Sequence, residues 1–316
     1  MVSGDGKGSR LLRTGLFALG LAVLLGLCSW LYRPRDNSTE GGMPNASANG
    51  WRSEPVGSID VFFVGSSEFY SAVAPLRIWD EAGITTYDVT TGSQRLYLAE
   101  QYVAQLLRER QPKLIVVDAY VIMTPVDWNE ALFNAAARPL PILNWHENWK
   151  CFDWETLRAP AVYTTHYEKK GFRPRGQSVS VKRRLYMRPT EERYAPPLLN
   201  WLYFQRIRAL CREAGVELLL LSIPSPRNWN MRRANTLRDY GERYGVGVLD
   251  LNLTEGLDID PATDYRDDGD HMNGAGARKV SVYMASYLRE HYHLTDHRGD
   301  PDFLPWQEDY ANYYGS

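Results

Sequence analysis

The chain has 316 residues, of which 44% are hydrophobic and 23% charged, so its composition is that of a folded globular protein and not of a disordered chain. It carries 36 basic and 38 acidic residues, a formal net charge of −2, and this balance disfavours nucleic-acid binding through bulk positive charge. Three cysteines are too few for a disulfide scaffold, and no CxxC or Cys/His pair has zinc-ligand spacing. We therefore expect no zinc site of this kind, and we predict no cofactor.

An uncharged apolar run covers residues 15–32 and just reaches the length needed to cross a bilayer. Three basic residues precede it, Lys7, Arg10 and Arg13, and basic residues favour retention of residues 1–14 in the cytoplasm. The alternative is a cleaved signal peptide, but a small-x-small cleavage site occurs only at residues 46–48, well beyond the run. The sequence predicts an uncleaved, single-pass signal anchor in the cell membrane, with everything after it extracytoplasmic.

Residues 33–57 are rich in Asn, Ser, Gly and Pro, a composition typical of a flexible linker. From residue 58 onward, short apolar runs alternate with segments of helical periodicity, and such alternation predicts a parallel sheet covered by helices on both faces. We therefore expect an α/β fold, a three-layer α/β/α sandwich with a flavodoxin-like sheet over residues 58–292, and a tail over 293–316. The predicted strands are 60–64, 84–89, 113–120, 216–222 and 246–250, and the predicted helices are 71–82, 94–108, 196–214, 230–244 and 273–291.

Residues 121–195 interrupt this alternation and are expected to form an insertion over the carboxyl edge of the sheet, where ligands bind in such folds. Its tryptophans, with His146 and His166, either line a cleft for a sugar or acyl group or pack the insertion onto the sheet. Eight basic residues between Lys169 and Arg188 indicate either a site for an anionic polymer or lipid headgroup, or a solvated loop. Cys151 and Cys211 pair only if the fold brings them close, which the sequence does not show.

Two short motifs carry the candidate chemistry. Gly65-Ser66-Ser67 follows the first predicted strand, and the segment from Asp264 to Asn273 reads DYRDDGDHMN before the last predicted helix. By itself, each motif is an ordinary helix start. Because the first strand is central and the last helix packs beside it, we expect both motifs at one edge of the sheet. There, Ser67 is the predicted nucleophile, His271 its base, and Asp268, three residues earlier, the carboxylate that orients His271.

The backbone amides of Ser67 and Gly92 are predicted to stabilise an oxyanion, because a glycine after the second strand lets a backbone N–H approach closely. Gly92 has the alternative role of a turn glycine. Further candidates for binding substrate are Gln94, Asp118 and Tyr120, which follow the second strand or end the third.

At these residues the chain resembles the SGNH hydrolase superfamily, also called GDSL-type, over roughly residues 58–292. Gly65-Ser66-Ser67 is similar to its first block, Gly92 to its second, and Asp268 to His271 to its last block, Asp-x-x-His. Ser66 replaces the usual aspartate, and the third strand ends Val117-Asp118-Ala119-Tyr120 without the asparagine that the third block supplies as an oxyanion donor. With the anchor, the chain resembles the membrane-anchored branch that includes the D-alanyl transfer protein of lipoteichoic acid and SGNH partners of membrane-bound O-acyltransferases.

The resemblance implies serine acyl chemistry, no metal, and a membrane-bound O-acyltransferase as partner. The sequence thus predicts an extracytoplasmic serine esterase or acyltransferase acting on acyl esters of a cell-envelope polymer. The alternative is a non-catalytic SGNH-like scaffold or binding module for such a polymer or for a membrane acyltransferase, which the missing asparagine favours.

Overall fold

The computed structural model of the chain describes residues 5–155, 157–182 and 185–315. These residues form two compact units. Unit 1 comprises Met1–Ala46 and Asn129–Thr165, and unit 2 comprises Ser47–Trp128 and His166–Ser316.

Unit 2 is built on a five-stranded sheet in which all neighbouring strands run parallel, in the order β2-β1-β3-β4-β5. The three strands on one side of the sheet are entirely buried, as their apolar sequences predict. The prediction of an α/β fold with a parallel sheet is confirmed. The strands are β1 (Val61–Gly65), β2 (Thr86–Thr90), β3 (Leu114–Asp118), β4 (Glu217–Ser222) and β5 (Gly247–Asp250).

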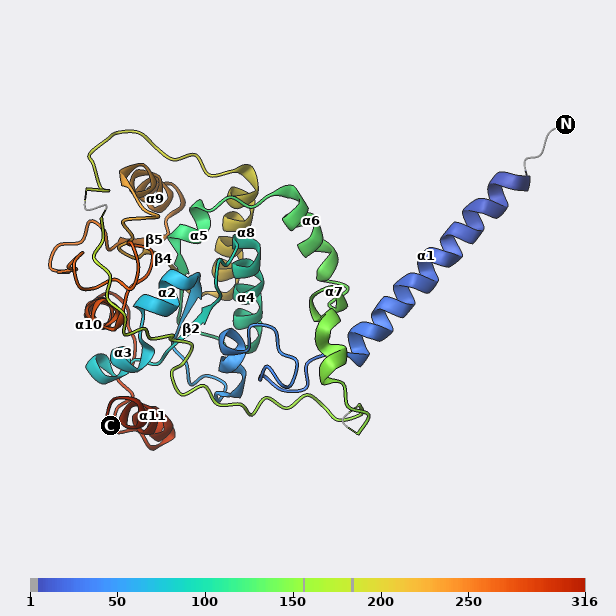
Figure 1. The fold of residues 1–316 in the computed structure, drawn as a ribbon, viewed down its shortest axis with the longest axis horizontal. Coiled ribbons are helices and arrows are strands. Elements are labelled where there is room, and N and C mark those ends of the chain that lie inside the picture. Colours follow the sequence, from blue (N-terminus) through green and yellow to red (C-terminus); the bar gives the residue numbers. More distant parts are fainter. Residues whose placement is uncertain (1–4, 156, 183–184, 316) are drawn as a thin grey trace. The chain divides into compact units, whose positions relative to one another are not determined.

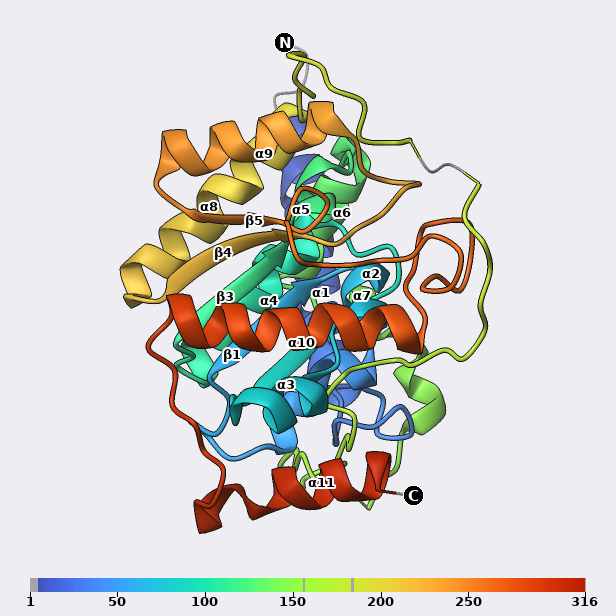
Figure 2. The same ribbon diagram turned by 90° about the vertical axis from the view of Figure 1, so that its left-hand side faces the viewer.

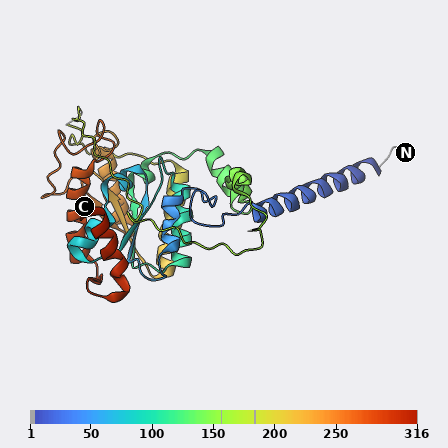
Figure 3. The ribbon, with the colours of Figure 1, turned by 60° about the horizontal axis from the view of Figure 1, so that its bottom comes forward.

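Helices cover both faces of this sheet. On one face α10 packs on α3, and on the other α4 packs on α8 (Figures 1, 2 and 3). Alternate strand residues such as Phe63 and Val116 form one core with Met284 and Leu288 of α10. The helices are α2 (Ser67–Ala72), α3 (Pro75–Ala82), α4 (Leu96–Glu109), α5 (Ala119–Met123), α8 (Leu198–Ala214), α9 (Met231–Tyr244) and α10 (Gly274–His291).

The structure differs from the sequence prediction at three places in unit 2. The helix predicted over 71–82 is two helices, because Pro75 has no N–H and starts α3. The second half of the predicted linker forms a 3₁₀ helix, η1 (Ala46–Ser53), that buries Trp51 completely. The predicted tail contains a 3₁₀ turn, η3 (Pro301–Phe303), and a helix, α11 (Leu304–Tyr314), whose Trp306 ring lies 5.8 Å from that of Trp79.

Unit 1 is dominated by α1 (Asp5–Leu31), whose segment Gly8–Leu31 is long and apolar enough to cross a membrane. Residues 129–165, part of the predicted insertion, belong to this unit and not to the sheet unit. They contain most of α6 (Trp128–Ala137), then α7 (Ile142–Trp145) and a 3₁₀ helix, η2 (His146–Cys151). Ile142 donates its N–H to Ser29 Oγ at 3.1 Å, and this bond fixes α7 to the last turn of α1.

Candidate active site

Ser67 is the first residue of α2, at the point where β1 ends on Gly65. Ser66 caps this helix, with Oγ accepting the N–H of Glu68 at 3.3 Å. Asp118, at the end of the neighbouring β3, holds the turn, because Oδ2 accepts both the N–H of Ser66 at 3.0 Å and its hydroxyl at 2.6 Å. A Cβ on Gly65 would lie 2.4 Å from Cβ of Asp118, so only glycine permits this close approach.

Asp118 was predicted to bind substrate, but its carboxyl group is used inside the protein. Its carboxyl group is fully buried, and Oδ1 accepts the N–H of Tyr120 at 2.9 Å. Burial raises the pKa of Asp118 to about 6, although the hydrogen bonds from Ser66 oppose the rise. The prediction that Asp118 binds substrate is therefore wrong, because both oxygens are used inside the protein to hold the turn before Ser67.

His271 lies in the loop before α10. Asn273 caps α10 by accepting the N–H groups of Ala275 at 2.9 Å and Gly276 at 3.2 Å. An antiparallel bridge between Tyr265 and Met272 closes the loop. The loop therefore presents His271 from a fixed backbone just ahead of the helix, which fits the predicted place of this residue.

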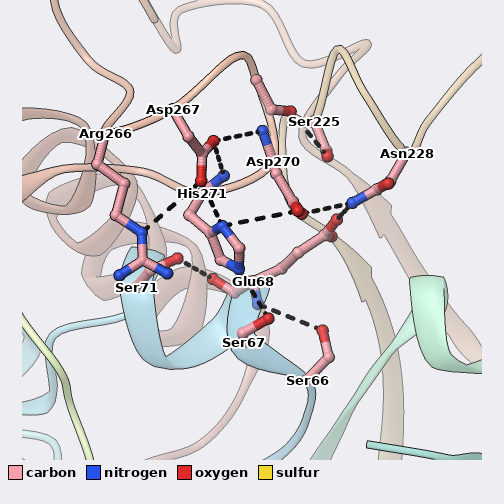
Figure 4. A network of polar contacts seen from close by, with 11 residues as sticks. Ser66, Ser67, Glu68, Ser71, Ser225, Asn228, Arg266, Asp267, Asp270 and His271 are labelled. Carbon is pink, nitrogen blue, oxygen red and sulfur yellow. Dashed lines mark hydrogen bonds and ion pairs between the residues drawn. The ribbon is translucent and has the colours of Figure 1, made fainter. Parts of the chain in front are cut away.

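Figure 4 shows Ser67, His271 and Asp267 in one chain of contacts. Nε2 of His271 lies 2.8 Å from Oγ of Ser67, and Nδ1 lies 2.6 Å from Oδ2 of Asp267. With the proton on Nδ1, as a hydrogen bond to a carboxylate requires, Nε2 is free to accept the serine proton. The structure thus brings together the predicted nucleophile and base, and supplies them with an orienting carboxylate.

The orienting carboxylate is Asp267 and not Asp268, so this part of the sequence prediction is wrong. The chain turns at Gly269, which has φ +84°. The turn folds Asp267 back, and Oδ1 of Asp267 accepts the N–H groups of Asp270 at 2.8 Å and His271 at 2.9 Å. Asp268 instead accepts the N–H of Lys182 at 2.8 Å. The Asp-Gly pair in the sequence signals such a turn, and could have suggested the earlier aspartate.

Asp267 is ionised at neutral pH. Partial burial opposes ionisation, but the hydrogen bonds from the side chain and backbone of His271 outweigh it, and the pKa of Asp267 lies below its usual value. A carboxylate in this position stabilises the imidazolium that forms when His271 takes a proton.

A second group of polar residues beside the site, Glu68, Asn228 and Asp270, was not predicted. Asn228 donates through Nδ2 to Oε1 of Glu68 at 2.7 Å and to Oδ1 of Asp270 at 2.6 Å (Figure 4). Burial, and then the charge of Asp118, raise the pKa of Glu68 well above its usual value. Oδ2 of Asp270 lies 3.7 Å from Nδ1 of His271, farther than Asp267, so Asn228 holds a competing carboxylate beside the imidazole. No sequence motif marks Asn228, which lies in the loop after β4.

The candidate oxyanion donors remain predictions. The N–H of Thr91 donates to the carbonyl of Gly65 at 3.2 Å, which places the loop that carries Gly92 beside the end of β1. Gly92 is exposed, and a Cβ there would lie 4.0 Å from the hydroxyl of Tyr70. Gln94 is buried, and its Oε1 accepts the hydroxyl of Thr91 at 3.1 Å. Among the described residues, Nε2 of Gln94 has no hydrogen-bond partner.

Tyr120 remains a candidate for binding substrate. Its side chain is half-buried, and its ring centroid lies 5.9 Å from the guanidinium carbon of Arg233. Burial raises the pKa of its phenol, so the hydroxyl stays protonated at neutral pH and keeps its capacity to donate.

The predicted insertion is divided. Residues 178–182 lie along the loop that carries His271, with the N–H of Val179 donating to Tyr265 at 2.8 Å. Two members of the basic stretch, Arg183 and Arg184, lie outside the described residues. Lys170 is fully buried and paired inside unit 2, so the stretch does not act as one exposed basic surface. Cys28, Cys151 and Cys211 are free cysteines in this structure.

Three ligand atoms of Asp267, Asp270 and His271 lie within 4.8 Å of one another, a donor set that a divalent cation accepts in principle. The imidazole, however, uses Nδ1 for Asp267 and Nε2 for Ser67. The donor set therefore coincides with the triad and does not form a separate site.

No family model and no curated protein matches the sequence. Among solved structures, the chain is similar to a lipase/acylhydrolase from Enterococcus faecalis, with 11% identity and a TM-score of 0.38 over 75% of this chain and 98% of that one. It is also similar to a GDSL-like lipase from Bacteroides thetaiotaomicron, with 11% identity and a TM-score of 0.38 over 78% of this chain and all of that one. At such identities and scores the likeness does not by itself assign an activity.

Proposed function

We propose that the protein is a serine-dependent ester hydrolase or acyltransferase. The observation that carries this proposal is the continuous contact from Ser67 through His271 to Asp267. Two residues 204 positions apart in the chain meet at hydrogen-bond distance, with a carboxylate on the far side of the imidazole. Acyl transfer requires this order of nucleophile, base and orienting group.

In the first half of the reaction, Oγ of Ser67 attacks the carbonyl carbon of an ester while its proton passes to Nε2 of His271. The electrons of the carbonyl double bond move to oxygen, and the amides of Ser67 and Gly92 are the proposed donors to that oxyanion. When the oxyanion collapses, the bond to the leaving alcohol breaks, and the imidazolium returns its proton to the alcohol oxygen. An acyl group is left on Ser67.

In the second half, water or an acceptor hydroxyl loses its proton to His271 and attacks the acyl-serine. Ser67 leaves and recovers the proton. Water gives hydrolysis and a hydroxyl gives acyl transfer, and the triad serves both. Asp267 remains ionised throughout and holds the tautomer of His271 in which Nε2 is free.

We further propose that α1 is an uncleaved signal anchor and that the catalytic unit acts outside the cytoplasmic membrane. The proposed substrate is an acyl ester of a cell-envelope polymer, and the proposed partner is a membrane-bound O-acyltransferase. The apolar length of α1 and the motif resemblance to the membrane-anchored branch of SGNH proteins support this assignment.

A second candidate is a non-catalytic scaffold, and the end of β3 favours it. The third strand ends without the asparagine that the third block supplies, and Asp118 at its end is buried and holds Ser66. Loss of one oxyanion donor costs on the order of 10²-fold or more in rate.

The decisive experiment treats the full-length protein in detergent with a fluorophosphonate and measures intact mass. The enzyme predicts one adduct on the wild type and none on Ser67→Ala, with labelling of His271→Ala slowed at least about 10³-fold. A folded wild-type protein that takes no adduct would support the scaffold.

The identity of the orienting carboxylate is tested by turnover of a nitrophenyl acetate. Asp267→Asn is expected to lower kcat on the order of 10³- to 10⁴-fold, because an amide donates to Nδ1 and favours the wrong tautomer. Asp268→Asn is the matched control, one residue away, and is expected to change kcat by less than about threefold. If the two variants exchange these outcomes, the assignment of Asp267 is incorrect.

A further inference from the structure

Unit 1 carries a group of exposed aromatic side chains beside the end of α1. Trp149 and Trp154 are 61% and 76% exposed, and Trp30, on α1 itself, is 50% exposed. Phe152 joins the two segments, since its ring lies 5.7 Å from that of Tyr32 and 4.9 Å from that of Trp154. We call these five residues the aromatic collar.

The collar is fixed to α1 by hydrogen bonds to the last turns of the helix. The hydroxyl of Ser29 donates to the carbonyl of Leu25 at 2.8 Å and accepts the N–H of Ile142 at 3.1 Å. Asn148 donates through Nδ2 to the carbonyl of Tyr32, the residue after α1, at 3.0 Å. Polar groups are thereby satisfied inside the protein, as is required near the hydrocarbon region of a bilayer.

The length of α1 sets the depth of the collar. The uncharged residues 15–32 span about 27 Å as a helix, close to the thickness of the hydrocarbon core, which is about 30 Å. If Gly15 lies at one boundary, Trp30 and Tyr32 lie at the other. The side chains held beside them by Ser29 and Asn148 then lie at the same level.

The chemistry of the collar suits this depth, at the boundary of the hydrocarbon core. Tryptophan and tyrosine gather at the membrane–water interface, where the ring is shielded and the N–H or O–H reaches water. Arg33 lies over the Trp30 ring, with Cζ 4.9 Å from its centroid, and donates to the carbonyl of Trp30 at 2.7 Å. A cation placed just beyond the apolar run suits the phosphate level of the headgroups.

We propose that the aromatic collar inserts into the interfacial region of the outer leaflet, so that residues 145–154 form a second membrane contact beside the anchor. The occupant of this apolar surface is phospholipid. Lipid is favoured because the surface is continuous with α1 and mixed in charge, with Glu147 paired to Lys150 at 3.0 Å. The inference rests on the proposed membrane-spanning role of α1.

The test uses the native cysteines of the full-length protein. Cys151 lies in η2 and is exposed, Cys28 lies in α1, and Cys211 is buried and poorly reactive. The Cys28→Ala variant places an environment-sensitive fluorophore on Cys151, and Cys151→Ser places it on Cys28. Glu290→Cys, at an exposed position of α10 and in a background lacking both cysteines, is the control. The proteins are reconstituted into phosphatidylcholine vesicles that contain brominated lipid.

The collar predicts that bromine near the carbonyl end of the acyl chain quenches the fluorophore on Cys151 at least twofold more than bromine at mid-chain. The fluorophore on Cys28 is quenched as well, and the one on the Glu290→Cys control is unaffected. Exchange of Trp149 and Trp154 for Ser is expected to at least halve the quenching at Cys151, whereas Trp201→Ser, in α8, leaves it unchanged.

Quenching at Cys28 without quenching at Cys151 would overturn the collar and leave the anchor intact. Quenching at neither would overturn both the anchor and the collar. Equal quenching at Cys151 and in the Glu290→Cys control would overturn the collar in favour of general surface adsorption. Protection of Cys151 from labelling in native membranes, without quenching in vesicles, would overturn it in favour of a protein partner.

Discussion

Asp88, on β2, is a fully buried carboxyl group. Among the described residues, neither of its oxygens has a hydrogen-bond partner. Burial raises the pKa of Asp88 well above its usual value. In the unfolded chain the same group ionises near pH 4. The folded protein therefore binds one more proton than the unfolded chain above that pH, and stability falls as pH rises toward the folded pKa.

Asp88→Asn removes this proton requirement. We expect the variant to have a higher melting temperature than the wild type at pH 7. Near pH 4 the two should be nearly equal, because Asp88 is protonated in the folded state and still about half protonated in the unfolded chain. Each unit of pKa difference corresponds to about 1.4 kcal/mol. Thermal unfolding of the full chain between pH 4 and 8 measures the effect.

The matched control is Asp60→Asn. Asp60 is also buried, but it is paired with Lys113 and with His297, each at 2.9 Å. There the same substitution removes a charge that has partners, and stability at pH 7 is expected to fall. If Asp88→Asn instead lost as much stability as Asp60→Asn at every pH, Asp88 would be shown to be ionised and paired.

At the site, the sequence prediction and the structure differ most in the roles of individual residues. Ser67 and His271 were predictable, because Ser67 follows a recognisable strand and His271 precedes a recognisable helix. Asp267 was not identified, because the choice between adjacent aspartates depends on the turn at Gly269, which sets the direction of both side chains. Asn228 and the internal use of Asp118 depend on contacts across the fold that no local pattern encodes.

At the scale of elements, the cap of α10 links stability to the site. Asn273 accepts two N–H groups of the helix and donates to the carbonyl of Thr263 at 2.6 Å across the His271 loop. Asn273→Ala is expected to cost about 1–2 kcal/mol of stability and, by loosening the loop, to lower kcat at least about tenfold.

Asn230→Ala is the matched control for this cap. Asn230 caps α9 by accepting the N–H of Arg233 at 3.2 Å. Its loss is expected to cost about 1 kcal/mol and to leave kcat within about twofold. Melting temperature and esterase turnover of both variants provide the comparison. Equal kcat for the two variants would mean that the cap of α10 does not position His271.

The elements themselves were largely predictable because their patterns are local. Apolar runs marked all five strands within a few residues, and helical periodicity marked α4, α8, α9 and α10. The exceptions have physical causes. Pro75 divides the predicted helix 71–82. The helix α11 was missed, because its apolar residues are explained by contact with α3 and not by a local pattern.

At the scale of the whole molecule, unit 2 joins distant parts of the chain through a buried charge cluster. Nζ of Lys170, with no exposed surface, lies 2.6 Å from Glu54, just after η1, and 2.7 Å from Asp309 in α11. Its Nζ also lies 4.7 Å from the ring centroid of Trp306. From the sequence, these two segments were predicted to be a linker and a tail. Neither has a clear local pattern, because the two segments are held together through Lys170 across the fold.

Lys170→Met tests whether this cluster holds the C-terminal helix. The variant removes the buried cation from Glu54 and Asp309 and leaves His166, 2.8 Å from Asp309, as their remaining basic partner. We expect the variant to lose about 3 kcal/mol of stability. It should also expose α11, so limited proteolysis is expected to remove the C-terminal residues faster than in the wild type. Lys169→Met is the matched control, since Lys169 is half-buried and its Nζ lies 4.9 Å from the Tyr313 ring. It is expected to cost less than about 1 kcal/mol. Equal proteolysis of the two variants would mean that α11 is held by its apolar face alone, through Trp306 and Trp79.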